Sequence, residues 1–244
     1  MRDQPRGEPQ ALPARILAFD WTRAEAELDA EGHTVLGGLL TADECTESAA
    51  LYDRDDLFRD RVVMARHGFG RGEYKYFAYP LPTLVAELRA SLYPRLVPTA
   101  NRWSAALGEG ACFPETHDAF LECCHAAGQS RPTPLLLSYA ADDFNCLHQD
   151  LYGEHVFPIQ AAILLAEPGR AFAGGEFVMT EQRPRKQSRA IVVGLRQGDA
   201  VLFAVRHRPA RGVRGIHRVT MRHGVSRVLS GTRRTMGVIF HDAA

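Results

Sequence analysis

Two residues with metal-binding side chains, His148 and Asp150, stand two positions apart in the segment Leu147-His148-Gln149-Asp150. Side chains two residues apart on a β-strand project from the same face, so this imidazole and this carboxylate could bind one metal ion. With a distant histidine they would form a 2-His-1-carboxylate triad, which leaves three coordination positions on Fe(II) for a cosubstrate and O2. The H-x-D pattern alone arises often by chance, so the prediction depends on further residues.

The third ligand must come from a neighbouring strand, and several histidines follow this pair in the chain. The candidates are His207, His217, His223 and His241. An oxygenase with this triad also needs an arginine for the distal carboxylate of 2-oxoglutarate, because a planar guanidinium can bind a carboxylate through two hydrogen bonds. Two pairs ten residues apart meet this need, His217 with Arg227 and His223 with Arg233, and their spacing leaves both open.

The second of these pairs lies in a segment that resembles the Fe(II)/2-oxoglutarate-dependent dioxygenases. The pattern H-x4-V-x2-G-x-R/K of that superfamily is matched by His223, Val228, Gly231 and Arg233. The resemblance implies that His148, Asp150 and His223 bind iron, and that Arg233 holds 2-oxoglutarate. It therefore favours His223 over His217 as the third ligand.

Further motifs carry the same resemblance over residues 132–244. The run GGEF at residues 174–177 resembles a glycine turn of the superfamily, and GDAVLF at residues 198–203 resembles the strand before its distal histidine. Tyr139 precedes His148 by nine residues, as in AlkB-type demethylases and prolyl-hydroxylase-like enzymes, which implies that its hydroxyl reaches 2-oxoglutarate. The resemblance implies a double-stranded β-helix, or jelly-roll, core that uses Fe(II), 2-oxoglutarate and O2.

The chain also departs from the AlkB pattern, which has asparagine at the position of Leu137 and a second arginine at the position of Ile239. Over nearly its whole length, including HGFGRGEYKYF, NCLHQDLYGE and TEQRPRKQSR, it resembles a bacterial family of predicted nucleic-acid oxygenases. This resemblance implies oxidative dealkylation of damaged DNA, a form of DNA repair. The alternative is a hydroxylase of a protein side chain or a small metabolite, and a non-catalytic nucleic-acid-binding barrel is a third possibility.

A strongly basic segment supports a polyanionic partner. Residues 183–234 contain 14 Lys and Arg and one acidic residue, Asp199, which gives a local balance of +13 in a chain whose net charge is zero. Such density is typical of nucleic-acid-binding surfaces. The candidate phosphate contacts are Arg183, Arg185, Lys186 and Arg189 in one loop and Arg206, Arg208, Arg211 and Arg214 in another. The alternative is a solvated, arginine-rich sheet paired with acids from the first half.

Aromatic residues provide a second possible contact with a base. Residues 67–80 contain three glycines followed by a dense group of rings, which predicts a glycine-hinged hairpin. The rings that could stack on a flipped base are Phe69, Tyr74, Tyr76 and Phe77. Simple packing is the alternative for each of them.

The pattern of turns and periodicities predicts an α+β fold, with an N-terminal helical layer on a C-terminal β core. Residues 1–14 are expected to be a flexible leader, 15–131 a helical region with the glycine and aromatic hairpin, and 132–244 the catalytic core of one integrated domain. Capping boxes at Thr22 and Thr41 predict two helix starts. Later helices are expected over residues 83–93, 98–107 and 114–127. Strands are expected over residues 33–36, 135–139, 156–165, 176–180, 190–195, 200–205 and 234–240.

Composition places the protein among ordinary globular chains. With 45% hydrophobic and 24% charged residues, 244 residues can bury a sizeable core. The sequence has neither an apolar run long enough for a membrane span nor a secretory signal pattern, so a cytoplasmic location is expected. The five cysteines lack zinc-site spacing and are an odd number, which favours reduced thiols.

Overall fold

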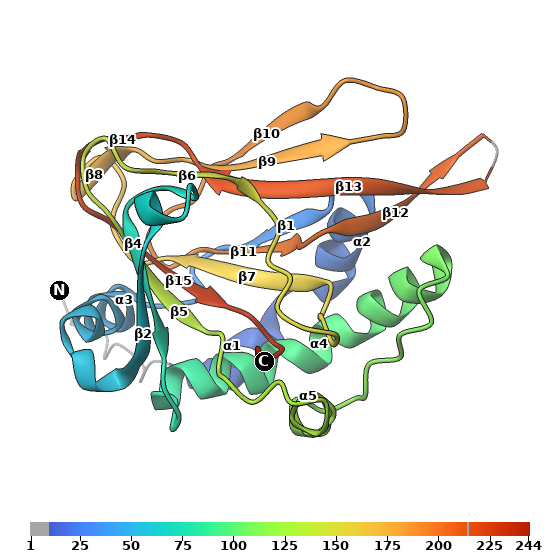
Figure 1. The fold of residues 1–244 in the computed structure, drawn as a ribbon, viewed down its shortest axis with the longest axis horizontal. Helices are drawn as coiled ribbons and strands as arrows, with labels where there is room; N and C mark the ends of the chain where they lie inside the picture. Colours follow the sequence, from blue (N-terminus) through green and yellow to red (C-terminus); the bar gives the residue numbers. More distant parts are fainter. Residues whose placement is uncertain (1–9, 214) are drawn as a thin grey trace, which may run out of the picture.

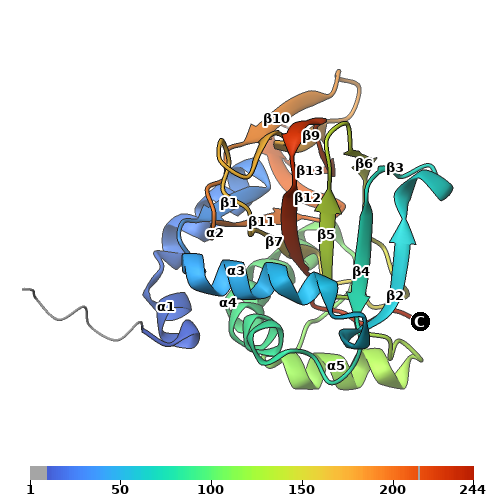
Figure 2. The same cartoon turned by 90° about the vertical axis from the view of Figure 1, so that its left-hand side faces the viewer.

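The computed structural model describes residues 10–213 and 215–244, which form two facing antiparallel sheets with helices against one of them (Figure 1). The α-helices are α1 (Leu12–Ala18), α2 (Trp21–Glu31), α3 (Ala42–Ala50), α4 (Thr83–Leu107) and α5 (His117–Ala126). Short 3-10 helices are η1 (Leu51–Asp53), η2 (Asp55–Leu57) and η3 (Met64–Arg66). Figure 2 shows α4 and α5 below the strands, with α3 running across the view above them.

Seven strands form the larger sheet in the order β1-β11-β7-β15-β5-β4-β2. Their bounds are β1 (His33–Leu36), β11 (Ala200–Ala204), β7 (Ile159–Leu164), β15 (Arg233–Val238), β5 (Leu135–Tyr139), β4 (Glu73–Phe77) and β2 (Phe58–Val63). Helix α4 lies along this sheet and buries Leu88, Leu92 and Leu96 in a core that includes Ile163 and Met236. This apolar layer holds the larger sheet on the helices.

The smaller sheet covers the other side in the order β10-β9-β13-β6-β3, and β12 also pairs with β13. Its strands are β10 (Arg189–Val193), β9 (Phe177–Gln182), β13 (Gly215–Val225), β6 (Phe144–His148), β3 (Gly70–Arg71) and β12 (His207–Gly212). A two-stranded sheet joins β8 (Phe172–Gly174) to β14 (Val228–Gly231). The predicted α+β jelly roll with a helical layer is confirmed.

The boundary expected at residues 131 and 132 does not separate two sheets. Strands β1, β2 and β4 come from the first part of the chain, yet they are hydrogen-bonded into the same sheet as β5, β7, β11 and β15. Residues 1–9 of the predicted leader lie outside the described residues. The rest of the leader prediction is wrong from Leu12 onward, because α1 begins there and buries Leu12 and Ile16.

Two helix predictions need correction. The first capping box is wrong, because α2 begins after Asp20, whose carboxylate accepts a hydrogen bond from the Arg23 amide at 2.9 Å; Asp20 caps the helix two residues before Thr22. The capping box at Thr41 is confirmed. Helix α4 is continuous through Pro94 and Pro98 instead of two separate helices. Each proline removes only one backbone donor, and the buried face on both sides holds the helix together.

The predicted glycine-hinged hairpin over residues 67–80 is also wrong. Its two halves join different sheets, since β3 pairs with β6 and β4 pairs with β2 and β5. Gly72 lies at the crossover with φ 114°, and a Cβ there would come 2.8 Å from the Tyr139 ring. Glycine is therefore required where the chain passes from one sheet to the other. None of the helices in residues 10–213 and 215–244 combines the length and apolar character of a membrane span.

The buried histidine His117 makes the stability of the fold depend on pH. Its Nε2 lies 2.8 Å from the carbonyl oxygen of Phe240, and burial, together with the nearby Arg89 charge, lowers its pKa to about 4. An unfolded chain binds a proton at this histidine below a pKa of about 6.5, whereas the folded protein does not. The stabilisation is therefore complete above pH 6.5 and decreases as the pH falls from about 6.5 to about 4.

We predict that His117→Gln, which retains a donor for Phe240, reduces the pH dependence of the unfolding free energy. At about 1.36 kcal/mol per pKa unit, the wild-type contribution lost between pH 6.5 and pH 5 is about 2 kcal/mol. Urea unfolding at pH 5 and pH 7.5 measures the difference. His67→Gln, at an exposed histidine, should leave the pH dependence unchanged. Equal pH dependence in wild type and His117→Gln would contradict the assignment.

Candidate metal centre and active-site cavity

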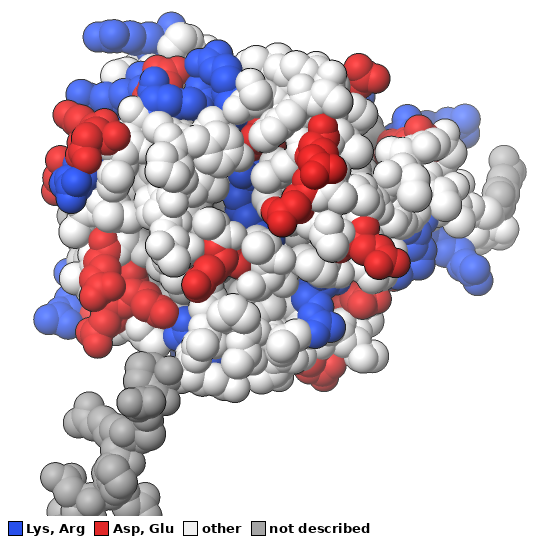
Figure 3. Space-filling model, turned by 90° about the horizontal axis from the view of Figure 1, so that it is seen from below, with Lys and Arg blue, Asp and Glu red and all other residues white. Residues whose placement is uncertain are grey.

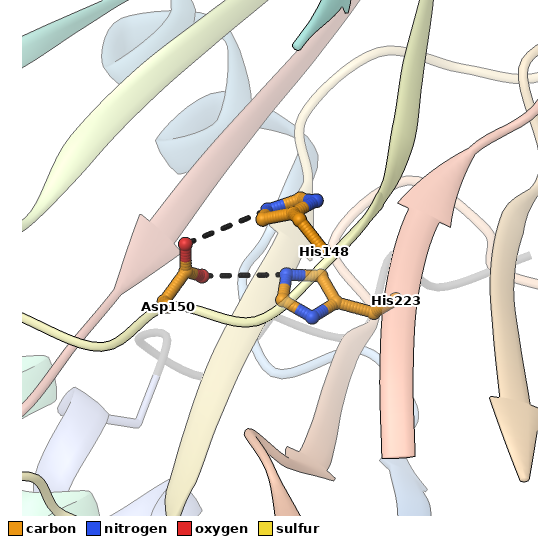
Figure 4. A group of neighbouring side chains, drawn as sticks. All are labelled: His148, Asp150 and His223. Atoms are coloured by element: carbon orange, nitrogen blue, oxygen red, sulfur yellow. Dashed lines mark ion pairs between the residues drawn. The ribbon is translucent and has the colours of Figure 1, made fainter. Parts of the chain in front are cut away.

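The pairing of β13 with β6 brings two histidines together, because His223 lies opposite His148 in the antiparallel register. Strand β6 ends at His148, and Asp150 follows just beyond the strand end. Asp150 Oδ1 lies 3.5 Å from His148 Nε2, and its Oδ2 lies 3.3 Å from His223 Nε2 (Figure 4). One donor atom from each residue lies within 4.8 Å of the others, so the three groups could hold one metal ion.

The surroundings of these groups favour an ionised Asp150 and a neutral His223. His148 Nδ1 donates to the carbonyl oxygen of Cys146 at 2.8 Å, so its Nε2 faces Asp150. Burial raises the pKa of Asp150, but the hydrogen bonds from His148 and His223 outweigh it and lower the pKa well below its usual value. Burial lowers the pKa of His223, whereas in His148 the contact with Asp150 outweighs burial and raises the pKa. An ionised carboxylate and a neutral imidazole are the forms that bind metal.

The charge balance of this group also fits a cation. Asp150 is only 8% exposed, and within the described residues no Lys or Arg forms an ion pair with it. A buried carboxylate without a cationic partner is costly. A divalent ion between the three side chains would supply the missing charge, and two imidazoles with one carboxylate are the donor set of non-haem Fe(II) sites.

A cavity of about 250 Å³ opens beside this group, between the two sheets. Apolar residues form most of its wall, including Leu137, Phe177 and Phe203. The polar residues on its wall include Tyr139, Asn145 and Arg233. A closed apolar space with few polar groups is typical of a small-molecule site.

Arg233 places an unpaired positive charge in the cavity. It is 1% exposed and has no acidic partner among the described residues, although its Nη1 donates to Thr235 Oγ1 at 2.5 Å. Its Nε has no partner, and burial lowers its pKa to about 10. Register places Arg233 opposite Tyr139, whose ring centre is 5.6 Å from the guanidinium carbon. This unsatisfied cation fits a carboxylate such as the distal one of 2-oxoglutarate.

Other candidate ligands from the sequence lie elsewhere. His217 is on β13 six residues before His223, paired with Ala210, and does not line the cavity. Arg227 is exposed and pairs with Asp142 at 3.6 Å. His241 is buried, and its Nδ1 accepts from the Phe157 amide at 3.2 Å. The structure thus brings together the pair His223 and Arg233 and does not bring His217 and Arg227 to the cavity.

The four aromatic residues proposed for substrate binding separate into two pairs. Phe69 and Tyr74 line the cavity, and Phe69 is 47% exposed. Phe77 is fully buried and stacks on Phe58 with ring centres 4.7 Å apart, so its assignment to base stacking is wrong. Tyr76 is also buried and does not line the cavity, which makes it unavailable to a base.

The basic loop joining β9 to β10 is partly neutralised by acids. Arg183 pairs with Glu181 at 2.6 Å, and Arg189 pairs with Glu31 at 2.6 Å. Arg185 and Lys186 are exposed and, within the described residues, form no ion pair, so they remain open to phosphates.

Of the second basic group, Arg208 is buried and pairs with Glu181 at 2.5 Å, so its assignment as a phosphate contact is wrong. Arg206 and Arg211 are exposed, and Arg214 lies outside the described residues. The helical face, seen from below in Figure 3, mixes acidic and basic side chains without a large area of one sign. The arginine-rich segment lies on the strands away from that face.

Sequence reasoning missed two residues beside Asp150. Tyr152 donates to Asp150 Oδ1 at 2.8 Å, and Gln160 Nε2 donates to Asp150 Oδ2 at 2.6 Å. His148, Asp150 and Tyr152 follow one another at intervals of two residues, and this spacing could have indicated Tyr152 from the sequence. Gln160 carried no local signal, because it reaches the site from the opposite sheet.

Residues 72–243 match a protein-family model, Oxygenase-NA, described as "Oxygenase, catalysing oxidative methylation of damaged DNA". The chain belongs to this oxygenase family. Two uncharacterised proteins from two strains of Mycobacterium tuberculosis are each 49% identical to it over 168 residues, which cover 69% of this chain and 72% of each relative. The family assignment confirms the resemblance to nucleic-acid oxygenases.

Solved structures show the same fold. A Trichoplax adhaerens prolyl hydroxylase, solved with a peptide fragment of hypoxia inducible factor, matches with a TM-score of 0.60 and 11% identity, covering 95% of this chain and 92% of that one. A Pseudomonas putida prolyl-4-hydroxylase matches with a TM-score of 0.54 and 15% identity, covering 92% of this chain and 100% of that one.

An oxidoreductase of the 2-oxoglutarate and Fe(II) oxygenase family from Burkholderia pseudomallei matches with a TM-score of 0.54 and 18% identity. The match covers 93% of this chain and 94% of that one. The protein is therefore an oxygenase by its family, and its fold is that of these prolyl hydroxylases and of this 2-oxoglutarate and Fe(II) oxygenase. The group of His148, Asp150 and His223 in this fold has the donor set that fits an Fe(II) ion.

We predict that His223→Ala weakens Mn(II) binding by more than about 100-fold. Loss of a hydrogen-bond partner of a metal ligand costs roughly 10- to 100-fold in affinity, and this substitution removes the ligand itself. His217→Ala should bind Mn(II) as wild type does. Calorimetric titration of the metal-free proteins measures both affinities. If His217→Ala lost Mn(II) binding and His223→Ala retained it, His217 and not His223 would be the third metal ligand.

We predict that Arg233→Gln raises the 2-oxoglutarate concentration needed for half-maximal turnover by roughly 10- to 100-fold, since a hydrogen bond to a charged group contributes about 1.5–3 kcal/mol. Mn(II) affinity without 2-oxoglutarate should not change. Arg234→Gln is the matched control, because Arg234 stacks on Tyr52 and does not line the cavity. If Arg233→Gln needed the same 2-oxoglutarate concentration as wild type, Arg233 would not be the residue that binds the cosubstrate.

Proposed function

We propose that this oxygenase removes alkyl groups from damaged bases in nucleic acid, using Fe(II) bound by His148, Asp150 and His223. The observation that carries the substrate class is the exposed ring of Phe69 on the wall of the metal-site cavity. Its ring stacks on His67, with centres 5.3 Å apart and planes at 22°. Leu151, which is 42% exposed, lines the same cavity. Planar and apolar surfaces at the entrance suit a base flipped out of its stack.

Basic residues beside this entrance suit the phosphates on either side of such a base. Arg66 and Arg71 flank Phe69 in the connection between β2 and β4, and both are exposed. Arg71 lies 3.9 Å from Asp143, a loose pairing that leaves it accessible. Arg185 and Lys186 lie farther along the smaller sheet and could extend the contact to more of the backbone. Binding of this kind weakens as salt rises, because phosphate contacts release counterions.

The residues of the cavity divide the work of the reaction. Bound iron with 2-oxoglutarate and O2 supplies the oxidation of a C–H bond. His148, Asp150 and His223 hold the metal, while Arg233 and the Tyr139 hydroxyl bind the distal carboxylate of the cosubstrate. The apolar walls exclude water. Hydroxylation of a methyl group on a base nitrogen gives an N-hydroxymethyl group, which is a hemiaminal. The hemiaminal then breaks its C–N bond, releases formaldehyde and restores the N–H.

The family description names damaged DNA, and that description supports the substrate class for this chain. The alternative is hydroxylation of a protein side chain or small metabolite, for which the spacing from His223 to Arg233 is the supporting feature. A cytoplasmic location stays a prediction.

We predict that a single-stranded oligonucleotide with an N-methylated base stimulates formation of succinate and formaldehyde at low salt, and that the unmethylated oligonucleotide does not. Stimulation should decrease as salt rises. If neither binding nor stimulation occurs, while a peptide library supports turnover, the nucleic-acid assignment is wrong and the alternative is favoured.

Phe69→Ala tests the proposed stacking directly. It should lower kcat/KM for the methylated oligonucleotide by roughly 5- to 100-fold, since stacking one base contributes about 1–3 kcal/mol. Turnover of 2-oxoglutarate without substrate should remain. Val192→Ala, an exposed apolar residue that does not line the cavity, is the control.

A further inference from the structure

Both oxygens of the Asp150 carboxylate already accept a hydrogen bond from a residue that is not a metal-ligand candidate. The Tyr152 hydroxyl donates to Oδ1 at 2.8 Å, and the Gln160 amide donates to Oδ2 at 2.6 Å. Gln160 is 5% exposed. Each carboxylate oxygen has a second lone pair, so both donors leave room for a metal ion.

The two donors reach Asp150 from different directions. Gln160 lies on β7 in the larger sheet, opposite Phe203 of β11, whereas the histidines lie on the smaller sheet. Tyr152 follows Asp150 in the segment that leaves β6. The carboxylate is therefore supported from the larger sheet on one side and from its own chain on the other, and it faces the two imidazoles between the sheets.

Tyr152 is itself supported by the aromatic residues of β4. Its ring meets that of Tyr76 edge to face, with centres 6.3 Å apart and planes at 88°. The Arg59 guanidinium covers the Tyr76 ring at 4.5 Å. Tyr76, which is too buried to contact a base, thus packs against the ring whose hydroxyl donates to Asp150.

We propose that Tyr152 and Gln160 are positioning residues that hold the Asp150 carboxylate in one orientation toward the two histidines before metal binds. The terminal torsion of an aspartate is broad, so without such donors the carboxylate would rotate among several orientations. Two donors select one orientation and offset the cost of burying the charge. The proposal requires the metal site but does not depend on nucleic acid as the substrate.

The test measures the Mn(II) affinity of the metal-free 244-residue chain by the loss of the electron paramagnetic resonance signal of free Mn(II). Tyr152→Phe removes only the hydroxyl, and Gln160→Met removes the amide at similar volume. Each should weaken Mn(II) binding roughly 10- to 100-fold, the usual effect of losing a partner of a metal ligand. Tyr93→Phe is the matched control, because Tyr93 is also buried and its hydroxyl donates to the Pro114 carbonyl at 3.0 Å away from the cavity.

Two further measurements separate positioning from packing. The spectrum of bound Mn(II) should change in Tyr152→Phe, whereas the 2-oxoglutarate affinity of the Mn(II)-saturated protein should stay within about threefold of wild type. Wild-type Mn(II) affinity in both Tyr152→Phe and Gln160→Met would overturn the proposal. An equal loss in Tyr93→Phe would also overturn it, since the effect would then be general. Failure of methylated DNA as a substrate would contradict the proposed function and leave these results unaffected.

Discussion

The antiparallel contact between β6 and β13 is the interaction on which the site depends. It sets His148 opposite His223, and the bulge after His223 lets Gly224 pass against the backbone of β6. A Cβ at Gly224 would come 2.6 Å from the Asn145 carbonyl oxygen, so a larger residue would push the strands apart. The two imidazoles, with ring centres 4.2 Å apart, would separate with them.

Two buried charges of opposite sign, Asp150 and Arg233, line different parts of the cavity. Within the described residues, Asp150 contacts two histidines but no Lys or Arg, and Arg233 lacks an acidic partner. Two unpaired buried charges are unfavourable for the empty protein, and each is offset when its ligand binds. This arrangement suits a cation beside the histidines and an anion at the end formed by β15 and β5. The elements that carry the charges belong to different sheets, so the jelly roll itself sets their separation.

Other charged residues in the arginine-rich segment serve the fold. Arg208 and Glu181 form a buried pair at 2.5 Å beneath the smaller sheet, and Arg183 and Arg189 also contact Glu181. The alternative of an arginine-rich sheet paired with acids from the first half holds for Arg189 with Glu31 and for Arg218 with Glu109, whereas Glu181 belongs to the second half. Exposed side chains without such partners, such as Arg185 and Lys186, are the ones left for a polyanion.

Local patterns in the sequence determined most of the elements of this protein and indicated its candidate metal ligands. The capping box at Thr41 and most strand positions depend on near neighbours and agree with the structure, which also places His148, Asp150, His223 and Arg233 at one cavity. Only the tertiary structure decided which aromatic and basic residues face the cavity or solvent, because burial depends on which segments pack together. Phe77 and Arg208 look like binding residues in the sequence and are buried by strands and helices far along the chain. Gln160 has no local signal and reaches Asp150 only because the two sheets close on each other.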